Sequence, residues 1–195
     1  MKKINYKIVE AEKSDAPFIA RGIMMALHIG EKDSAIDMRD DEISIWEKIF
    51  TELAGRIDTQ YSYKNTLKAI DDEGHILGII VSYDGAQLHC LREPFFTTVR
   101  EYTGKDFSNI PDETTPDEWY LDSLSVGRPY RRQGIGSALL LKACQRAFSC
   151  GKPAGLLVDK FNTTARKAYE RLGFRYIGER PFTNIMMDHL RKENL

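Results

Sequence analysis

The chain is poor in cysteine, in long apolar runs and in any excess of charge of one sign. Its 3 cysteines are an odd number without a Cys-x-x-Cys pair or metal-ligand spacing, so we expect reduced thiols in a cytoplasmic protein. The longest apolar run, residues 76–81, is too short to cross a bilayer, and no apolar segment of a signal peptide follows the basic start at residues 1–3. We therefore expect neither export nor membrane insertion.

Charge and composition argue against two further classes of protein. With 28 Lys and Arg against 29 Asp and Glu, the formal net charge is -1, and the basic surplus of a nucleic-acid binder is missing. A composition of 42% hydrophobic and 29% charged residues is typical of a folded chain, and 195 residues without repeats or linkers suit one domain, residues 1–195. The four histidines lack metal-ligand spacing, so no metal site is expected: His28, His75, His89 and His189.

Hydrophobic periodicity predicts a mixture of strands and helices. Segment 84–118 is longer than a connection in a compact domain usually is, and we interpret it as an insertion containing a short helix over 95–102. A polar loop is expected over 29–41. Strands are expected over 5–11, 66–70, 75–83, 119–126, 154–159, 174–180 and 184–190, and helices over 15–28, 43–55, 137–150 and 162–172.

The most informative segment is Arg131-Arg132-Gln133-Gly134-Ile135-Gly136, between an expected strand and an expected helix. The first N–H groups of a helix have no internal partner, and they point toward whatever lies at its N-terminus. Glycine at 134 and 136 leaves room for a pyrophosphate to approach these amides, and the arginines add charge-assisted donors. The segment therefore indicates a site for a phosphate-bearing cofactor.

Two familiar phosphate motifs do not fit this segment. A P-loop needs a Lys-Ser/Thr pair after its second glycine, and the dinucleotide fingerprint needs glycine where Leu139 stands. The remaining pattern, Arg-x-x-Gly-x-Gly, resembles the acetyl-CoA-binding signature of the GNAT N-acetyltransferase superfamily. The alternatives are an ordinary strand-to-helix turn with exposed arginines and an unrelated nucleotide-binding domain.

A second segment, residues 162–174, resembles the downstream motif of the same superfamily. In that motif an asparagine opens a helix, a tyrosine lies on it, and Gly-Phe ends it; here these are Asn162, Tyr169 and Gly173 with Phe174. Asparagine is a good N-cap, and glycine suits a left-handed helix stop. The alternative is a short amphipathic helix with its tyrosine in the core.

The resemblance rests on motifs within 119–180 and elsewhere on element order. It implies a mixed α/β (α+β) fold with a mostly antiparallel sheet of about seven strands flanked by helices, with an insertion before the central strand. It also implies N-acetyl transfer, in which a primary amine attacks the thioester of acetyl-CoA directly through a tetrahedral intermediate. Acetyl-CoA would be the acetyl donor, and no metal is implied. A non-catalytic CoA-binding regulatory module of the same fold is the alternative.

The resemblance assigns roles to individual residues. Tyr169 would protonate or hydrogen-bond the departing thiolate. Asp122 is the candidate base, on one face with Tyr120, Leu124 and Val126 if no bulge intervenes before Leu124, and an ordered water is the alternative. The expected contacts to the cofactor are Leu124, Ser125, Val126, Arg131, Arg132, Gln133, Gly134, Ile135, Gly136, Ser137, Asn162, Ala165 and Tyr169.

The acceptor is less well defined by the residues. Segment 31–42 has six acidic residues against two basic ones, and 84–118 has eight against three. In the superfamily these regions would border the acceptor pocket, where negative potential would attract a cationic amine, although a solvated acidic surface is the alternative. A small-molecule or peptide amine is expected, with no nucleic-acid or membrane partner. A homodimer is the default expectation.

Overall fold

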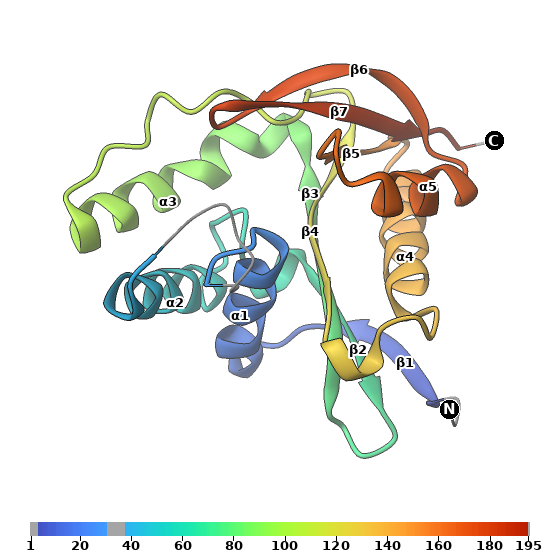
Figure 1. Ribbon diagram of the computed structural model, residues 1–195, viewed down its shortest axis with the longest axis horizontal. Helices are drawn as coiled ribbons and strands as arrows, with labels where there is room; N and C mark the ends of the chain where they lie inside the picture. Colours follow the sequence, from blue (N-terminus) through green and yellow to red (C-terminus); the bar gives the residue numbers. More distant parts are fainter. Residues whose placement is uncertain (1–3, 31–37, 195) are drawn as a thin grey trace.

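The computed structural model describes residues 4–30 and 38–194, and within them one seven-stranded sheet runs through the molecule (Figure 1). The strand order is β1-β2-β3-β4-β5-β7-β6. Neighbouring strands are antiparallel except β4 and β5, which are parallel. The strands are β1 Tyr6–Glu10, β2 Thr66–Asp71, β3 Ile76–Asp84, β4 Trp119–Val126, β5 Ala154–Val158, β6 Arg175–Phe182 and β7 Ile185–Lys192. The predicted fold class is confirmed.

Helices cover both faces of the sheet (Figure 1). Alternation along β3 separates two cores, because Ile79 and Val81 pack with α1 to α3 whereas Ile80 packs with α4 on the opposite face. The α4 face also receives Tyr169 of α5. The helices are α1 Ala16–Ala26, α2 Asp40–Ala54, α3 Leu88–Thr103, α4 Ile135–Ser149 and α5 Thr163–Arg171.

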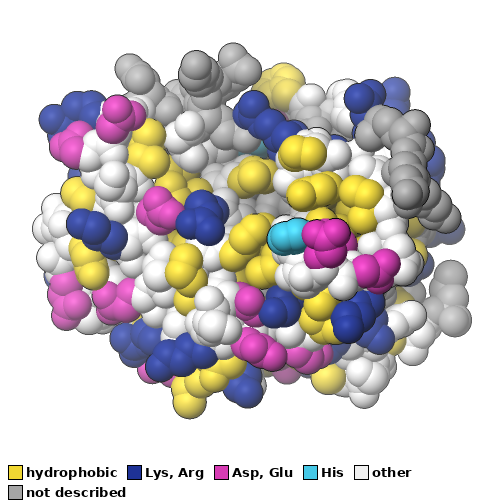
Figure 2. Space-filling model, turned by 90° about the horizontal axis from the view of Figure 1, so that it is seen from below, with side chains coloured by type: hydrophobic (Ala, Val, Ile, Leu, Met, Phe, Trp, Pro, Cys, Tyr) yellow, Lys and Arg dark blue, Asp and Glu magenta, His cyan; other side chains and the backbone are white. Residues whose placement is uncertain are grey.

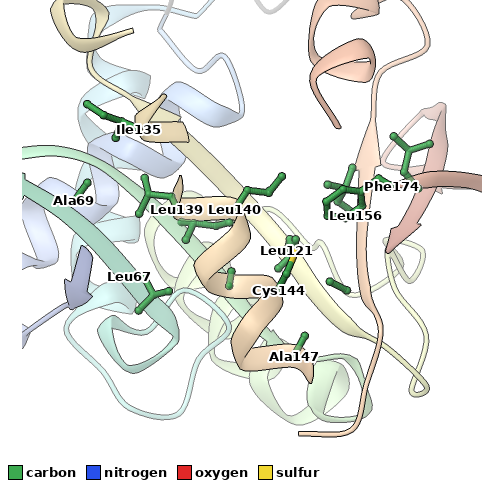
Figure 3. Packing of buried hydrophobic residues seen from close by; sticks show 14 of the residues in the cluster. Leu67, Ala69, Leu121, Ile135, Leu139, Leu140, Cys144, Ala147, Leu156 and Phe174 are labelled. Atoms are coloured by element: carbon green, nitrogen blue, oxygen red, sulfur yellow. The ribbon is translucent and has the colours of Figure 1, made fainter. Parts of the chain in front are cut away.

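The apolar face of α4 fixes the position of its first turn. Ile135, Leu139 and Leu140 are buried at helical spacing against β2, β4 and β5, as Figure 3 shows for part of the cluster. Burying each of these side chains contributes about 1.5–3 kcal/mol. Because Ile135 is 1% exposed, its side chain is part of the core and only its backbone is available at the helix N-terminus.

The predicted short helix over 95–102 is wrong in its starting point, because α3 begins at Leu88 and continues through Pro94. Proline inside a helix removes one backbone hydrogen bond and costs about 3 kcal/mol. Packing on both sides of the proline opposes that cost. Leu88 is buried against Tyr83, and Phe95 is buried in the core of the α1 to α3 face. The insertion therefore contains a packed helix of 16 residues.

No helix within 4–30 and 38–194 is long and apolar enough to cross a bilayer. In the same ranges no group of three or more His, Cys, Asp or Glu side chains is arranged to hold a metal ion. Cys90, Cys144 and Cys150 are free thiols.

Candidate active site

The glycine-containing turn of residues 131–136 leads from the end of β4 into α4. Arg132 and Gly134 both have left-handed backbone, with φ of 61° and 84°. The carbonyl of Gly134 accepts the first helical hydrogen bond, from the N–H of Ala138 at 3.0 Å. The N–H groups of residues 135–137 therefore precede the helical ladder and have no acceptor within it. Such a cluster of amides at a helix N-terminus is a ready anion-binding site.

The two glycines of the turn are required for different reasons. Gly134 has a left-handed backbone, which glycine adopts without the strain that a side chain brings. Gly136 has no positive φ, and a Cβ added there would meet only Val126 Cγ2, at an ordinary 3.6 Å. The fold would accept a side chain at 136, which would extend into open space beside the first-turn amides. A missing side chain at such a point is expected where a ligand needs the space.

The side chains of the turn differ in their availability. The Arg131 guanidinium donates from Nε to the Val126 carbonyl at 3.0 Å, so it partly serves to hold the turn. Gln133 Oε1 accepts from the N–H of Ile4 at 3.3 Å and ties the turn to the N-terminal segment. Arg132 is exposed and has no ion pair or hydrogen bond to the described part of the chain. Of Arg131 and Arg132, Arg132 therefore has the guanidinium that is available to bind an anion.

The surface around this end of the molecule is mixed in charge. Figure 2 views the molecule from the side on which the β2–β3 turn and the N-terminal end of α4 lie, and basic and acidic side chains are interspersed on it. Local donors at the turn, rather than a broad basic field, would therefore determine anion binding there.

Strand β4 contains a bulge at Asp122. Ser123 pairs with Val81 and Leu121 pairs with Ser82, so Asp122 is an extra residue on β4 without a partner on β3. A one-residue bulge changes which face the following side chains occupy.

The bulge places Asp122 away from the residues that follow it. Leu121, Leu124 and Val126 pack against the core beneath α4. Asp122 points to the opposite face, where its carboxylate lies 3.2 Å from the hydroxyl of Tyr83. The expectation that Asp122 shares a face with Leu124 and Val126 is wrong, because the condition of an unbroken strand is not met. Ser125 also lies on the α1 side and is buried there.

Strands β4 and β5 pair only near their first residues and then separate. Their register pairs are Trp119 with Ala154 and Tyr120 with Gly155, and no further pair follows within the described residues. Beyond Tyr120 the edge of β4 that faces β5 therefore lacks a strand partner. Backbone groups of 121–125 on that edge have no strand partner there and can bind another molecule, whereas the Val126 carbonyl accepts from Arg131 Nε. The predicted contacts Leu124, Ser125 and Val126 lie along it.

The start of α5 has the local structure predicted for it. The Asn162 side chain accepts a hydrogen bond from the N–H of Ala165 at 3.0 Å, which caps the helix. Tyr169 packs against Phe174 with ring centroids 6.0 Å apart. Burial raises the pKa of the Tyr169 phenol, so it stays protonated at neutral pH. Within the described ranges its hydroxyl has no hydrogen-bond partner, so it is free to donate to another molecule.

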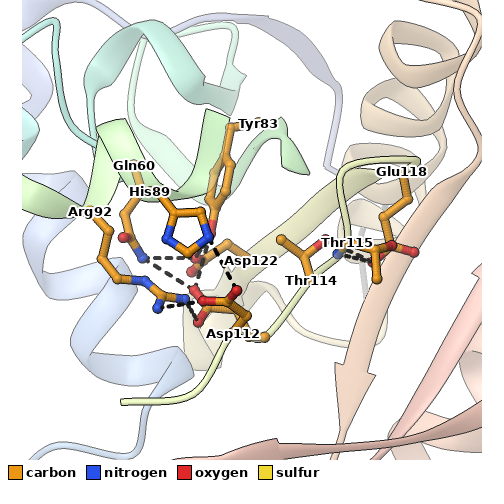
Figure 4. Close-up of polar contacts among 10 residues, drawn as sticks. Gln60, Tyr83, His89, Arg92, Asp112, Thr114, Thr115, Glu118 and Asp122 are labelled. Atoms are coloured by element: carbon orange, nitrogen blue, oxygen red, sulfur yellow. Dashed lines mark hydrogen bonds and ion pairs between the residues drawn. The ribbon is translucent and has the colours of Figure 1, made fainter. Parts of the chain in front are cut away.

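On the opposite face, Asp122 belongs to a buried polar network (Figure 4). The Tyr83 hydroxyl lies 3.2 Å from Asp122 Oδ2 and 3.2 Å from Glu113 Oε1. The Gln60 amide nitrogen is 3.5 Å from the same two carboxylate oxygens. Arg92, which is 2% exposed, pairs with the other oxygen of Glu113. Two carboxyl groups and one guanidinium therefore lie in one cluster, in which Glu113 and Arg92 are buried and Asp122 is partly exposed.

Burial controls the protonation of this network. Burial, followed by the charge of Asp122, raises the pKa of Glu113 to about 7, and Arg92 opposes the shift. Burial also raises the pKa of Asp122, against hydrogen bonds donated by Ser123 and Tyr83. The sequence prediction named Asp122 and missed Glu113, Arg92 and Tyr83. The only signal for them was the acidic composition of segment 84–118, from which Arg92 and Glu113 come.

The raised pKa of Glu113 makes stability depend on pH. Between the ordinary value of 4.5 and about 7 the folded protein binds more protons at this site than the unfolded chain does. The free energy of unfolding therefore falls as pH rises through that window, by about 3 kcal/mol for this group. Urea unfolding at both ends of the window measures the fall. Glu113→Gln should reduce it markedly, and an equal fall in this variant would contradict the assignment.

Two acidic segments, 31–42 and 84–118, were expected to border the acceptor pocket, and the structure describes only the second in full. Residues 31–37 of the loop 31–42 lie outside the described residues. Segment 84–118 is described, and it packs Arg92 and Glu113 against Asp122. Two surface hollows of about 510 and 360 Å³ lie elsewhere and include no residue of the turn or of the Asp122 network.

The sheet, with strands β4 and β5 that separate and the N-terminus of α4 beside them, defines a mixed α/β fold. A family model described as the acetyltransferase (GNAT) family matches residues 35–174. The chain belongs to this family, which places it in the acyltransferase class. The resemblance found in the two sequence motifs is thereby confirmed. A comparison with curated proteins finds no match.

Solved structures support the same fold. A crystal structure named as an acetyltransferase is 29% identical with a TM-score of 0.76, covering 96% of this chain and 98% of that one. An N-acetyltransferase from Staphylococcus aureus Mu50 is 21% identical with a TM-score of 0.78, covering 95% and 99%. A "histone acetyltransferase HPA2 and related acetyltransferase" from Corynebacterium glutamicum ATCC 13032 is 20% identical with a TM-score of 0.68, covering 97% and 96%. The last two, because of their low identity, support the fold alone.

Proposed function

We propose that the protein transfers the acetyl group of acetyl-CoA to a primary amine by direct attack on the thioester. The observation that carries the proposal is Gly136, a glycine that the backbone does not require, set beside open space and free first-turn amides. A diphosphate suits that position, since it accepts several N–H hydrogen bonds and interacts favourably with a helix N-terminus. Membership of an acetyltransferase family supports the same donor.

Acetyl-CoA would be held along three elements. The N–H groups of Ile135, Gly136 and Ser137 would bind the diphosphate, with Arg132 as a charged donor. The pantetheine arm would follow the unpaired edge of β4, where backbone groups can bind its amides. Asn162 and Ala165 lie at the start of α5, and this helix places Tyr169 on the α4 face of the sheet.

The chemistry divides between the two faces of the sheet. Asp122 lies on the α1 to α3 face and Tyr169 on the α4 and α5 face. The acceptor amine would lose its proton to Asp122, directly or through a water, and attack the acetyl carbon. Backbone amides of β4 would stabilise the oxyanion, and the Tyr169 phenol would protonate the departing thiolate. Positioning of the two reactants can supply about 7–11 kcal/mol, more than either proton transfer.

Tyr169→Phe is expected to lower turnover by about 100-fold, the lower end for loss of a general acid, while acetyl-CoA binding is retained. The ring still packs on Phe174, so the fold should be unaffected. Stopped-flow and steady-state rates of CoA release measure the effect. Tyr102→Phe, which removes an exposed hydroxyl on α3, is the control. An unchanged rate in Tyr169→Phe would exclude Tyr169 as the acid.

The proposed function is tested by following free thiol release from acetyl-CoA with a panel of amines. The panel should contain polyamines, aminoglycosides, amino acids, and peptides with a free N-terminus or lysine. Amine-dependent release supports the enzyme and identifies the acceptor class. Tight CoA binding without turnover across the panel would instead support a regulatory CoA-binding module of the same fold.

A further inference from the structure

Glu113 lies next to the candidate base and has no role in the mechanism described so far. We propose that Glu113 and Asp122 hold a single proton between them, so that Glu113, as a positioning residue, makes Asp122 a base strong enough to deprotonate an ammonium acceptor. The proposal rests on the proposed function of Asp122. It extends that function by adding a residue from the 84–118 insertion to the proton-transfer site.

The hydrogen-bond geometry calls for a shared proton. The Tyr83 hydroxyl has one hydrogen, yet its oxygen lies 3.2 Å from a carboxylate oxygen of Asp122 and 3.2 Å from one of Glu113. If both carboxyl groups were ionised, the Tyr83 oxygen and one of the two carboxylate oxygens would face each other with no hydrogen between them. A proton on either carboxyl group supplies the missing donor. With one carboxyl proton in total, both contacts of the Tyr83 oxygen contain a hydrogen.

The balance of buried charges also favours one proton on the two carboxyl groups. Arg92 is 2% exposed and Glu113 is 6% exposed, so one buried guanidinium faces two carboxyl groups. A second ionised carboxylate in this space has no buried cation to offset it. The rise of the pKa of Glu113 to about 7 is consistent with one proton bound to the pair up to neutral pH.

The other ionisable groups around the pair do not compensate it. Burial raises the pKa values of Tyr61, Tyr83 and Tyr120 well above 10.0, so these phenols stay neutral. Asp112 pairs with Arg92 at 3.2 Å and with His89 at 3.2 Å, but its side chain is 44% exposed and faces solvent. The two carboxyl groups of Glu113 and Asp122 therefore titrate together, and the Arg92 guanidinium is the buried cation beside them.

A pair of this kind is a better base than a lone aspartate. The acceptor ammonium gives its proton to the pair, and the freed nitrogen lone pair attacks the acetyl carbon. The C–S bond then breaks and the thiolate takes a proton from Tyr169, while the second proton that the nitrogen loses on becoming an amide restores the Tyr169 phenol. The proton on the pair returns to solvent. Burial raises the pKa of Asp122 above its ordinary value, and each tenfold gain in proton affinity makes the first transfer tenfold more favourable at equilibrium.

The pH profile of kcat/KM tests the proposal with the best acceptor of the amine panel. In the native enzyme the activity should rise with a midpoint near pH 7, where the pair loses its proton. Glu113→Gln should move that midpoint to lower pH and lower kcat by at least about 10-fold. Asp112→Asn is the matched control, because it also removes a carboxylate beside Arg92 but does not touch Tyr83; its midpoint should stay. An unmoved midpoint in Glu113→Gln overturns the proposal.

Infrared titration of the native protein tests the shared proton without relying on a variant at Glu113. A protonated-carboxyl band should disappear as pH rises through about 7, and it should be absent or strongly shifted in Asp122→Asn. Two carboxyl groups that remain ionised throughout the neutral range would overturn the proposal. Because this measurement needs no acceptor, it decides on the pair even if no amine is acetylated and the proposed function fails.

Discussion

Gly136→Glu is expected to abolish acetyl-CoA binding while leaving the fold intact. The glutamate side chain would occupy the open space in front of the first-turn amides and bring a negative charge to where the diphosphate is proposed to lie. Each charge-assisted hydrogen bond contributes about 1.5–3 kcal/mol, so loss of two of them lowers affinity by at least about 100-fold. Isothermal titration with acetyl-CoA measures the change.

The same substitution should not destabilise the free protein. Glutamate in the first turn of a helix interacts favourably with the helix dipole, by about 0.3–1 kcal/mol, and it has a better helix propensity than glycine. The nearest atom to an added Cβ, Val126 Cγ2, is 3.6 Å away. Gln145→Glu adds the same charge at an exposed position further along α4 and should leave affinity unchanged. Unimpaired binding in Gly136→Glu would show that the diphosphate does not lie at this turn.

Asp122→Asn is expected to lower kcat by about 100- to 10,000-fold, the range for loss of a general base. The amide keeps the shape of the carboxyl group and can still accept from Ser123, whose hydroxyl lies 2.6 Å from Asp122 Oδ1. Acetyl-CoA affinity should not change, because Asp122 points to the face opposite α4. A combined measurement of kcat and of the dissociation constant for acetyl-CoA separates the two effects.

Two outcomes would contradict the role of Asp122. Full activity in Asp122→Asn would mean that an ordered water, supported by other groups, removes the proton. A loss confined to KM would mean that the carboxylate binds the acceptor equally in the ground and transition states. Asp112→Asn, a more exposed carboxylate in the same region, controls for the general loss of negative charge.

The sequence predicted well those features that local patterns determine. The N-cap of Asn162, the glycine turn at 131–136 and the buried face of α4 each depend on residues close together in the chain. Capping, left-handed turns and helical periodicity act over a few residues, so a single sequence carries them. Most strand and helix positions were predictable for the same reason.

The rest of the site depends on contacts between distant segments. The bulge at Asp122 exists only in the pairing of β4 with β3, so nothing within β4 itself reveals it. Glu113 lies near Asp122 because Tyr83 of β3 contacts both carboxyl groups and Arg92 of α3 pairs with Glu113, and these segments are far apart in the sequence. The side chains that shift the pKa of the candidate base could therefore not be predicted from the sequence.

The most direct test of the central claim is a crystal structure of the protein with CoA. We expect the diphosphate within hydrogen-bond distance of the N–H groups of Ile135, Gly136 and Ser137, with the pantetheine arm along the free edge of β4 and the sulfur near Tyr169. A diphosphate bound at any other position, with these amides facing solvent, would contradict the account.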